Sequence, residues 1–332
     1  MINKNKKTAF KPIKIFISLL LLLNICFFSG CSFFDEIFDY FGDDIDVSGK
    51  FAVHFIDVGQ GDSILIQSPD NEFMLIDTGE RDQYDKLTAY LDHFGAKRFK
   101  YVIFTHPHSD HIGSANNIVK NYDIETLIMS SVTHTSKTFG RLVKEIEKKK
   151  IEITEAVCGD IYDFGEAQFT VLAPISDNYR NLNNYSVAIL MDYGNTSFLF
   201  TGDMEKESEY EVIRYCKENN FDISVDVLKV SHHGSSTSSQ TAFLKLVNPS
   251  FAVIMCGNSN SYNHPNIKTV GRVESAGAEV YRTDLDGDIV IISDGKDLTV
   301  KKGREAAVEY KTGNYEGEEF EKEVNEDFVE EE

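Results

Sequence analysis

Cysteine and basic residues are scarce in this chain of 332 residues, and each scarcity excludes a class of protein. Its five cysteines are scattered, without the close spacing of a zinc-binding motif or the framework of a disulfide-rich secreted domain. Lysine and arginine together number 33 against 54 aspartates and glutamates, which gives a net charge of -21. Because affinity for nucleic acid rests mainly on neutralising phosphates, this composition gives no support to a broad nucleic-acid-binding face.

A single folded domain is nevertheless expected. Hydrophobic residues make up 42% of the chain and charged residues 26%, as in ordinary soluble globular proteins, and the length suffices for a sizeable core. No internal repeat is evident, and the apolar pattern predicts one compact domain over residues 50–302. Residues 305–332 hold twelve acidic side chains and two lysines, so we expect residues 303–332 to form an acidic disordered tail. A solubilising role without a specific partner is the simplest interpretation of that tail.

The N-terminus predicts export. Five lysines precede an apolar stretch, residues 15–28, which only Ser18 and Asn24 interrupt, and the small residues Ser29 and Gly30 follow. A basic leader, a short apolar segment and small residues are typical of a signal peptide, here residues 1–30. The stretch is short for a membrane-spanning helix, although an uncut membrane anchor is the alternative.

Cys31 predicts a lipid anchor. Its place directly after Ser29 and Gly30 resembles the lipobox of bacterial lipoproteins, in which the cysteine is lipidated and becomes the new N-terminus. Phe28 stands where leucine is usual. The resemblance implies a lipid at Cys31, a tether over residues 31–49 and a protein held on the extracellular face of the cell membrane.

Strands and helices are expected in mixed batches along the domain. Short apolar runs with Gly, Asp and Asn turns between them predict strands, and runs with a 3.6-residue period predict helices. The expected strands are residues 51–58, 63–67, 73–76, 101–104, 126–129, 151–155, 168–172, 187–191 and 197–200, with a last hairpin near 288–292 and 298–301. The expected helices include residues 84–94, 112–121 and 139–149. Two sheets with helices outside fit this order better than one parallel sheet, so the fold class is α+β.

Three histidines and an aspartate lie within six residues, immediately after the expected strand 101–104. They are His106, His108, Asp110 and His111. Neutral imidazole and carboxylate suit Zn²⁺ and other divalent first-row ions, and ligands this close together can serve two adjacent metals. The run therefore predicts half of a two-metal centre.

Two further strand ends offer ligands. Asp203 ends one apolar strand, and His232 and His233 end another. Alone, Asp203 could be a turn residue or a helix N-cap, and the histidine pair could be structural. Three strand ends that each present ligands argue for one shared cluster. His264 lies in a polar loop, residues 258–266, where it could contact the substrate or protonate the leaving group, or make only a local hydrogen bond.

These residues together resemble the metallo-β-lactamase superfamily, a four-layer αββα sandwich with its metal site between the ends of two sheets. Residues 75–79 resemble its first motif, in which Asp77 would support the metal loop, and the run from His106 to His111 resembles its second. The resemblance implies Asp203 as the bridging aspartate and His232 or His233 as the last ligand. It also implies a metal-dependent hydrolase with two divalent ions, Zn²⁺ or alternatively Mn²⁺, in which a hydroxide bridges the metals and Asp110 orients it.

Four segments match more closely one subgroup, the metallo-β-lactamase domain of the ComEC-type competence proteins. They are residues 55–63, 183–186, 229–235 and 262–265. This resemblance implies a phosphodiesterase or nuclease with DNA as its substrate, and it extends to that one domain. Ser186 and Ser235 fall in these segments and could bind phosphate or support a metal ligand, although a structural role is the simpler interpretation for each.

One departure concerns the first metal. Most hydrolases of the superfamily have another histidine between the second motif and the bridging aspartate, but residues 183–186 contain none. His134 is the only histidine in that interval, and it remains an alternative ligand. The first metal would then keep His106, His108 and Asp203, and we expect that site to be the weaker one.

Other functions remain open at this point. The acidic composition favours a hydrolase of a small cell-wall phosphoester, such as phosphocholine, as an alternative to a nuclease. A β-lactamase is disfavoured, since Asp203 stands where those enzymes usually have cysteine. A binding module without turnover is disfavoured too, because the residues of the metal loop are all present.

Overall fold

The computed structural model describes residues 45–304, in which a compact unit begins at Val47. The expected signal peptide, the lipidation site Cys31, tether residues 31–44 and tail residues 305–332 lie outside the described residues. Within residues 45–304, no helix combines the length and the apolar character needed to cross a membrane.

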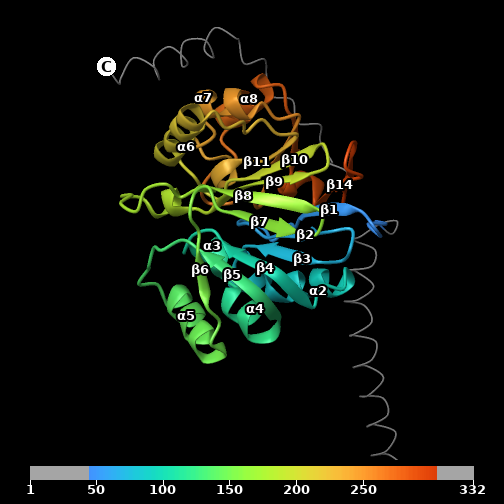
Figure 1. Ribbon diagram of the computed structural model, residues 1–332, viewed down its shortest axis with the longest axis vertical. Coiled ribbons are helices and arrows are strands. Elements are labelled where there is room, and N and C mark those ends of the chain that lie inside the picture. Colours follow the sequence, from blue (N-terminus) through green and yellow to red (C-terminus); the bar gives the residue numbers. More distant parts are fainter. Residues whose placement is uncertain (1–44, 305–332) are drawn as a thin grey trace, which may run out of the picture. The chain divides into compact units, whose positions relative to one another are not determined.

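Two mixed sheets lie face to face in this unit (Figure 1). The first sheet has the order β15-β14-β1-β2-β3-β4-β5-β6 and the second the order β13-β12-β11-β10-β9-β8-β7. The strands of the first are β1 (Phe51–Phe55), β2 (Ile64–Gln67), β3 (Phe73–Ile76), β4 (Arg98–Phe104), β5 (Asp123–Met129), β6 (Ile153–Glu155), β14 (Ile289–Ser293) and β15 (Leu298–Lys302). Those of the second are β7 (Ile161–Phe164), β8 (Ala167–Ala173), β9 (Ala188–Tyr193), β10 (Thr196–Phe200), β11 (Val227–Lys229), β12 (Phe251–Ile254) and β13 (Glu279–Arg282).

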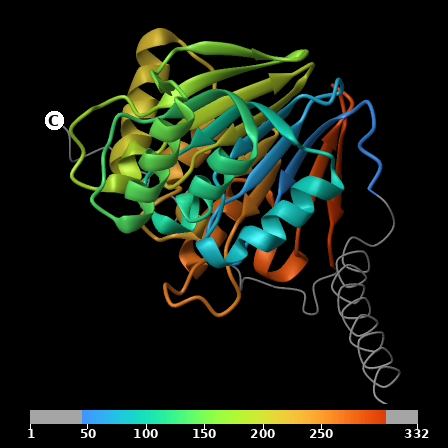
Figure 2. The same ribbon diagram turned by 90° about the horizontal axis from the view of Figure 1, so that it is seen from below.

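Helices cover the outer face of each sheet, as Figures 1 and 2 show. Helices α2 (Tyr84–His93), α4 (Ala115–Asn121) and α5 (Lys137–Lys149) cover the first, and α6 (Lys206–Asn219), α7 (Thr241–Val247) and α8 (Ile267–Ser275) cover the second. Short helices are η1 (Arg81–Gln83), α3 (Ser109–Ile112), η2 (Leu182–Tyr185), η3 (Ser231–Gly234) and α9 (Thr283–Asp286). The expected α+β class and the four-layer αββα sandwich are confirmed.

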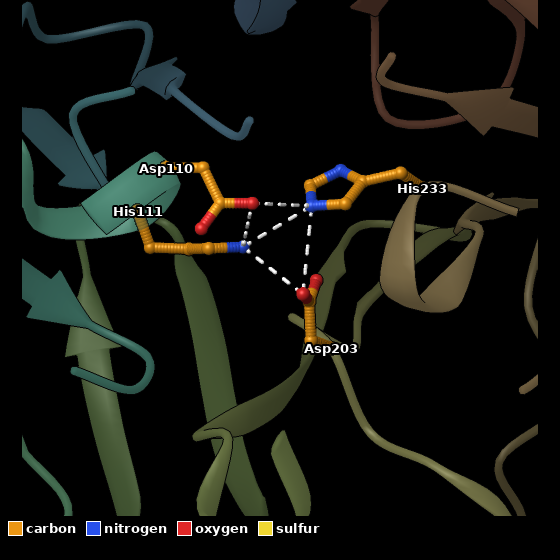
Figure 3. A group of neighbouring side chains, drawn as sticks. All are labelled: Asp110, His111, Asp203 and His233. Atoms are coloured by element: carbon orange, nitrogen blue, oxygen red, sulfur yellow. Dashed lines mark hydrogen bonds and ion pairs between the residues drawn. The ribbon is translucent and has the colours of Figure 1, made fainter. Parts of the chain in front are cut away.

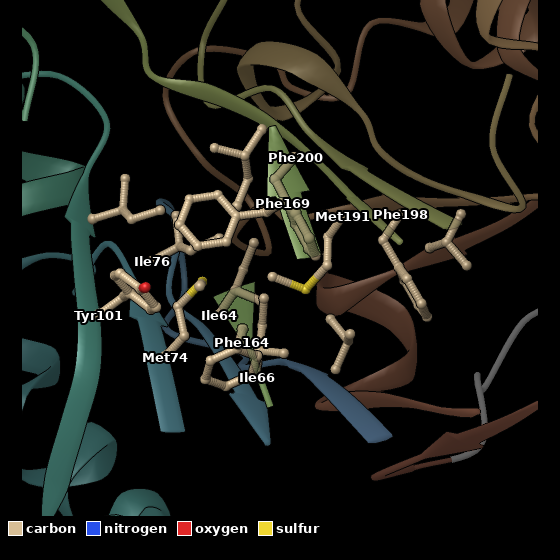
Figure 4. Packing of buried hydrophobic residues seen from close by; sticks show 14 of the residues in the cluster. Ile64, Ile66, Met74, Ile76, Tyr101, Phe164, Phe169, Met191, Phe198 and Phe200 are labelled. Carbon is tan, nitrogen blue, oxygen red and sulfur yellow. The ribbon is translucent and has the colours of Figure 1, made fainter. Parts of the chain in front are cut away.

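The main core lies between the sheets (Figure 4). Residues two apart on a strand point to the same face, so Ile64 with Ile66 on β2 and Phe198 with Phe200 on β10 all point inward. Each of these four side chains is at most 2% exposed. Burial of one such side chain contributes roughly 1.5–3 kcal/mol to folding, so this alternation fixes which face of each strand is inside.

Three details differ from the sequence-based expectation. The first strand ends at Phe55, because residues 56–63 leave the sheet as a loop. The expected helix 112–121 is divided into α3 and α4, and the Ser114 hydroxyl between them donates to the carbonyl of Glu80. Strand β7 was not expected, because its run of four residues is short. It lies at the edge of its sheet, where Ile161 is 57% exposed, so burial imposes little apolar pattern on it.

Parallel pairing positions the functional residues. Strands β3 to β6 pair in parallel in the first sheet, as do β10 to β13 in the second. Strands that run in parallel present their carboxyl ends at the same edge of a sheet, where loops can carry functional side chains. The loops after β3 and β4 of the first sheet and those after β10, β11 and β12 of the second meet at one end of the sandwich.

Candidate metal centre

The histidine run leaves β4 and immediately enters helix α3. His108 is extended, with φ -75° and ψ 152°, and the helix begins at Ser109. Asp110 and His111 therefore lie on the first turn of α3 and point across the sandwich toward Asp203 and His233 (Figure 3).

These four side chains form a close group of potential ligands. Their ligand atoms all lie within 4.8 Å of one another. The Nε2 atom of His111 is 3.2 Å from Oδ2 of Asp203 and 3.3 Å from Nε2 of His233. The His233 Nε2 atom is in turn 3.3 Å from Oδ2 of Asp110 and 3.4 Å from Oδ2 of Asp203. Of the two histidines expected as the last ligand, His233 and not His232 belongs to this group.

The other ring nitrogen of each histidine is already bonded. His111 donates through Nδ1 to Oδ2 of Asp77 over 2.7 Å, and His233 donates through Nδ1 to the carbonyl of Met255 over 2.9 Å. Asp77 is itself held by the backbone N–H and the hydroxyl of Thr105, at 2.8 and 2.6 Å. When Nδ1 of a neutral imidazole carries the proton, the lone pair of Nε2 is free for a metal. Both rings are therefore oriented as metal ligands require.

The histidines and aspartates of this group shift one another's pKa values toward their charged forms. Burial alone would lower the pKa of His111, but Asp203, Asp77 and Asp110 outweigh it and raise that pKa well above its usual value. The pKa of His233 is raised in the same way, chiefly by Asp203 against the effect of burial. Burial would raise the pKa of Asp203, yet the histidines around it hold it well below its usual value. A divalent cation can take the place of the protons that this buried set would otherwise hold, so the residues fit such an ion.

His106 and His108 lie beside this group without belonging to it. The Nε2 atom of His106 is 3.0 Å from Nδ1 of His108 and 3.8 Å from Oδ2 of Asp203. Burial holds the pKa of His106 well below its usual value, so the ring is neutral, as a ligand must be. Ser186 supports both sides: its hydroxyl is 3.3 Å from Nδ1 of His106 and accepts the N–H of Asp203 over 2.9 Å.

His232 approaches the centre from the second sheet. Its Nε2 atom is 3.8 Å from Oδ2 of Asp203, and its Nδ1 atom is 3.2 Å from Oε1 of Glu205. Consecutive left-handed conformations, with φ 50° at His232 and 53° at His233, direct both imidazoles toward Asp203. The alternative ligand His134 lies farther out, with its ring centroid 6.3 Å from that of His108.

Two residues of the centre carried no expected role in the sequence. Lys229 is 1% exposed, and its Nζ lies 2.5 Å from Oδ2 of Asp62. Asp62 also faces His233, with 3.4 Å between Oδ1 and Nδ1. Burial would raise the pKa of Asp62, but Lys229 and then His233 lower it below its usual value. The signal for this pair was a single lysine inside an apolar strand, since a buried charge needs a partner.

A glycine allows the loop of Asp62 to reach the metal loop. Gly61 has φ 131°, and a Cβ there would lie 2.2 Å from the carbonyl oxygen of Asp110. The N–H of Asp62 donates to that same oxygen over 3.2 Å. The segment 55–63 is therefore part of the site because its backbone can approach α3 so closely.

The loop after β12 forms the rim of the centre. His264 is half-buried, with its ring centroid 5.3 Å from that of His232 and 6.3 Å from that of His233. Burial, and then these two neighbours, lower the pKa of His264 to about 4, so it is neutral at pH 7. Ser235 bonds within its own loop, since its hydroxyl accepts the N–H of Thr237 over 3.3 Å.

Known proteins resemble this chain in sequence and in fold. The family model described as the metallo-beta-lactamase superfamily matches residues 56–257. ComE operon protein 3 of Bacillus subtilis (strain 168) is 31% identical over 260 residues, which are 73% of this chain and 33% of that protein. Competence protein ComA of Neisseria gonorrhoeae is 27% identical over 237 residues, 71% of this chain and 31% of that protein. This chain spans about a third of the length of these curated relatives.

A solved structure shares the fold. CmlA, a diiron beta-hydroxylase from Streptomyces venezuelae, matches with a TM-score of 0.51 and 13% identity, over 73% of this chain and 54% of that one. At this identity the likeness supports the architecture alone. The sequence relatives confirm the expected resemblance to the competence proteins.

Proposed function

Because this chain belongs to the metallo-β-lactamase superfamily and is a metal-dependent hydrolase of that fold, we propose that it hydrolyses phosphodiesters, with DNA as the substrate. One observation carries the proposal. A single carboxylate oxygen, Oδ2 of Asp203, lies 3.2–3.8 Å from Nε2 of four histidines, His106, His111, His232 and His233. Asp203 and these histidines would hold divalent ions here, and paired ions would suit the displacement reactions of phosphodiesters.

The residues of the chain divide the remaining tasks. Bound divalent ions supply Lewis-acid stabilisation of the developing charge and a nucleophile at neutral pH. Asp77 and the Met255 carbonyl hold the two imidazoles in the tautomer that leaves Nε2 free. Asp110 is anionic, because His111 and His233 hold its pKa below the usual value against the effect of burial. Its carboxylate can therefore accept a hydrogen bond from the attacking nucleophile and orient it.

His264 fits the role of a substrate contact. Since its pKa of about 4 leaves it neutral at pH 7, it suits a hydrogen bond to a substrate oxygen better than protonation of a leaving group. Its Nδ1 atom is buried and has no hydrogen-bond partner. One ring nitrogen of His264 therefore has unused hydrogen-bonding capacity beside the centre.

A groove beside the centre supports a substrate that carries phosphates. It begins at Glu205 and Thr237, which both contact His232. Its lining includes four basic side chains and four glutamates, so its charge is balanced in a chain whose net charge is -21. The basic residues are Arg180, Lys206, Arg214 and Lys217. The resemblance of residues 55–63, 183–186, 229–235 and 262–265 to the ComEC-type domain also supports DNA as the substrate.

Purified protein loaded with Zn²⁺ or Mn²⁺ tests the proposal on bis-p-nitrophenyl phosphate and on single-stranded DNA. We expect cleavage of both, loss of cleavage on chelation, and at least a hundredfold lower turnover for Asp110→Ala with an unchanged fold, a loss of the size seen when an orienting group is removed. Asp123→Ala is the matched control, since Asp123 is exposed at the start of β5. A folded, metal-loaded protein that cleaves neither substrate would refute the phosphodiesterase.

A small phosphoester is the second candidate, and the net charge of -21 favours it because polyanions are repelled. p-Nitrophenyl phosphorylcholine is the probe. Metal-dependent cleavage of this ester without cleavage of DNA would show that the enzyme hydrolyses a small phosphoester and is not a nuclease.

We also propose that a lipid at Cys31 holds the enzyme on the extracellular face of the cell membrane. The leader with its five lysines and the small residues before Cys31 support this. Cys31→Ser should move the protein from the membrane fraction to the soluble fraction. A variant that stays in the membrane fraction would point to an uncut anchor instead.

A further inference from the structure

We propose that Tyr262 is a stacking platform for a nucleobase beside the scissile phosphodiester, and that the substrate is therefore single-stranded nucleic acid. This inference rests on the proposed phosphodiesterase function and names the substrate form that the site would take. Tyr262 is 64% exposed and is the one aromatic residue among the exposed large hydrophobic side chains of residues 45–304. It lies two residues before His264, at the rim of the metal centre.

Three rings lead from the centre to the surface. The rings of His233 and His264 are stacked, with centroids 6.3 Å apart and planes at 30°. The rings of His264 and Tyr262 are also stacked, with centroids 5.8 Å apart and planes at 26°. The series therefore begins at a metal ligand and ends at an exposed phenol ring. A planar group that stacks on the exposed ring of Tyr262 would continue the series outward from the metal centre.

The loop that carries Tyr262 is fixed by one side chain. The amide of Asn260 donates to the carbonyls of Gly257 and His264, at 2.9 and 2.5 Å. Its oxygen accepts the N–H groups of Tyr262 and His264, at 3.1 and 3.0 Å. Four hydrogen bonds from a single residue thus fix the backbone of the loop at Tyr262 and His264. A platform that is already ordered loses little conformational freedom when a ligand binds.

The loop is also fixed to the turn that presents the histidines. The N–H of Asn266 donates to the carbonyl of Gly234 over 2.8 Å. Pro265 packs so closely on that turn that a Cβ on Gly234 would lie 2.6 Å from its Cβ. The distance from the platform to the metal ligands is therefore set by backbone contacts, as positioning of a substrate requires.

The chemistry of the platform favours an unpaired base. Every nucleobase has a π-face, and stacking on an exposed aromatic side chain is the usual way in which single strands bind without regard to sequence. In a duplex these faces are covered by neighbouring bases, so a strand whose bases can separate is required. A net charge of -21 leaves little attraction to phosphates, and stacking supplies affinity that does not depend on that attraction. A phosphocholine ester has no planar ring and would gain nothing from Tyr262.

Steady-state cleavage of a short single-stranded DNA by the metal-loaded, full-length protein tests the platform. We expect Tyr262→Ala to raise KM roughly tenfold, within the range found for loss of one base stack, with kcat and bound metal unchanged. Tyr262→Phe keeps the ring and should stay within about twofold of wild type. Ile267→Ala is the matched control, because Ile267 is an exposed apolar residue nearby, 51% exposed, that has no ring; it should also leave KM unchanged.

An abasic substrate makes the test specific for the stack. One tetrahydrofuran residue is placed at each position around the cleaved bond in turn. At one position the wild-type protein should lose the same factor of roughly ten, and Tyr262→Ala should lose nothing further, because both changes remove one contact.

The outcomes separate the platform from the phosphodiesterase. If wild type cleaves DNA and Tyr262→Ala has the same KM, the platform is overturned while the phosphodiesterase stands. The same conclusion follows if Ile267→Ala raises KM as much as Tyr262→Ala does. The platform is also overturned if, at every position, the effect of the abasic residue on KM adds in full to the effect of Tyr262→Ala. If wild type cleaves neither DNA nor bis-p-nitrophenyl phosphate, the phosphodiesterase itself has failed, and the platform is overturned with it.

Discussion

Asp77→Asn tests the centre without removing a metal ligand. Asp77 is fully buried and accepts three hydrogen bonds, two of them from Thr105 and one from Nδ1 of His111. The amide has nearly the same shape, but its nitrogen would replace Oδ2 opposite His111. That nitrogen can only donate, so Nδ1 of His111 must become an acceptor and its proton must move to Nε2. Nε2 then carries a proton where the metal needs a lone pair.

The size of the effect follows from the bonds that are involved. To bind metal, the variant must return the proton to Nδ1, where two N–H groups would then face each other with no acceptor between them. Leaving a buried donor without a partner costs about 1–3 kcal/mol. We therefore expect metal to bind roughly 10–100-fold more weakly, which is also the range known for loss of a group that supports a metal ligand. Rotation of the amide by about 180° would not remove this cost, because the backbone N–H of Thr105 would then face the amide nitrogen and lose its acceptor.

Competition with a chelating dye measures this affinity, and metal-dependent thermal stabilisation provides a second measurement. A protein that binds metal 30-fold more weakly should lose about 2 kcal/mol of metal-induced stabilisation at saturating metal. Asp226→Asn is the matched control, since its carboxylate accepts the N–H of Ser197 over 2.9 Å where β10 and β11 begin, at their ends away from the centre. Asp77→Asn with wild-type metal affinity and a native melting transition would show that Asp77 does not set the tautomer of His111.

Two further substitutions test the surroundings of the centre. Gly234→Ala should lower the free energy of unfolding by roughly 2 kcal/mol and weaken metal binding, because Gly234 has φ 78° and its Cβ would lie 2.6 Å from that of Pro265. Urea unfolding measures this, and Gly140→Ala in α5, where a Cβ meets nothing within 4 Å, should instead be neutral or stabilising. Relative to wild type, Asp288→Asn should gain roughly 4 kcal/mol of stability between pH 4 and pH 8. Burial raises the pKa of Asp288 to about 7, so the wild-type fold keeps a proton that the unfolded chain has released, and stability falls as the pH rises from about 4 to 7. An equal difference in unfolding free energy at both pH values would contradict this.

Much of the architecture could be predicted from apolar periodicity. Residues 73–76 were expected as a strand and form β3 with the same bounds, and the last hairpin lies within one residue of its expected place. The errors occur where contacts with distant segments override the local pattern. Residues 56–58 are apolar enough for a strand, yet Asp57 donates its N–H to Asp288 across the chain and the backbone leaves the sheet. The pattern could not reveal such a partner 231 residues away.

The sequence by itself determined the chemistry of the centre, because imidazoles and carboxylates at successive strand ends are the ligands that divalent ions prefer. It could not separate His232 from His233, since adjacent residues of the same type carry the same signal. Tertiary structure decided between them: the Met255 carbonyl at the end of β12 holds Nδ1 of His233 and turns Nε2 toward the cluster.

Tertiary structure also decided that Lys229, on an apolar strand, is buried beside Asp62, from a loop of the other sheet. Neither residue has a metal-binding signature of its own. Ligand type is a property of single residues and can be read along the chain, whereas the proton on a ring nitrogen and the partner of a buried charge depend on groups that only folding brings within hydrogen-bonding distance.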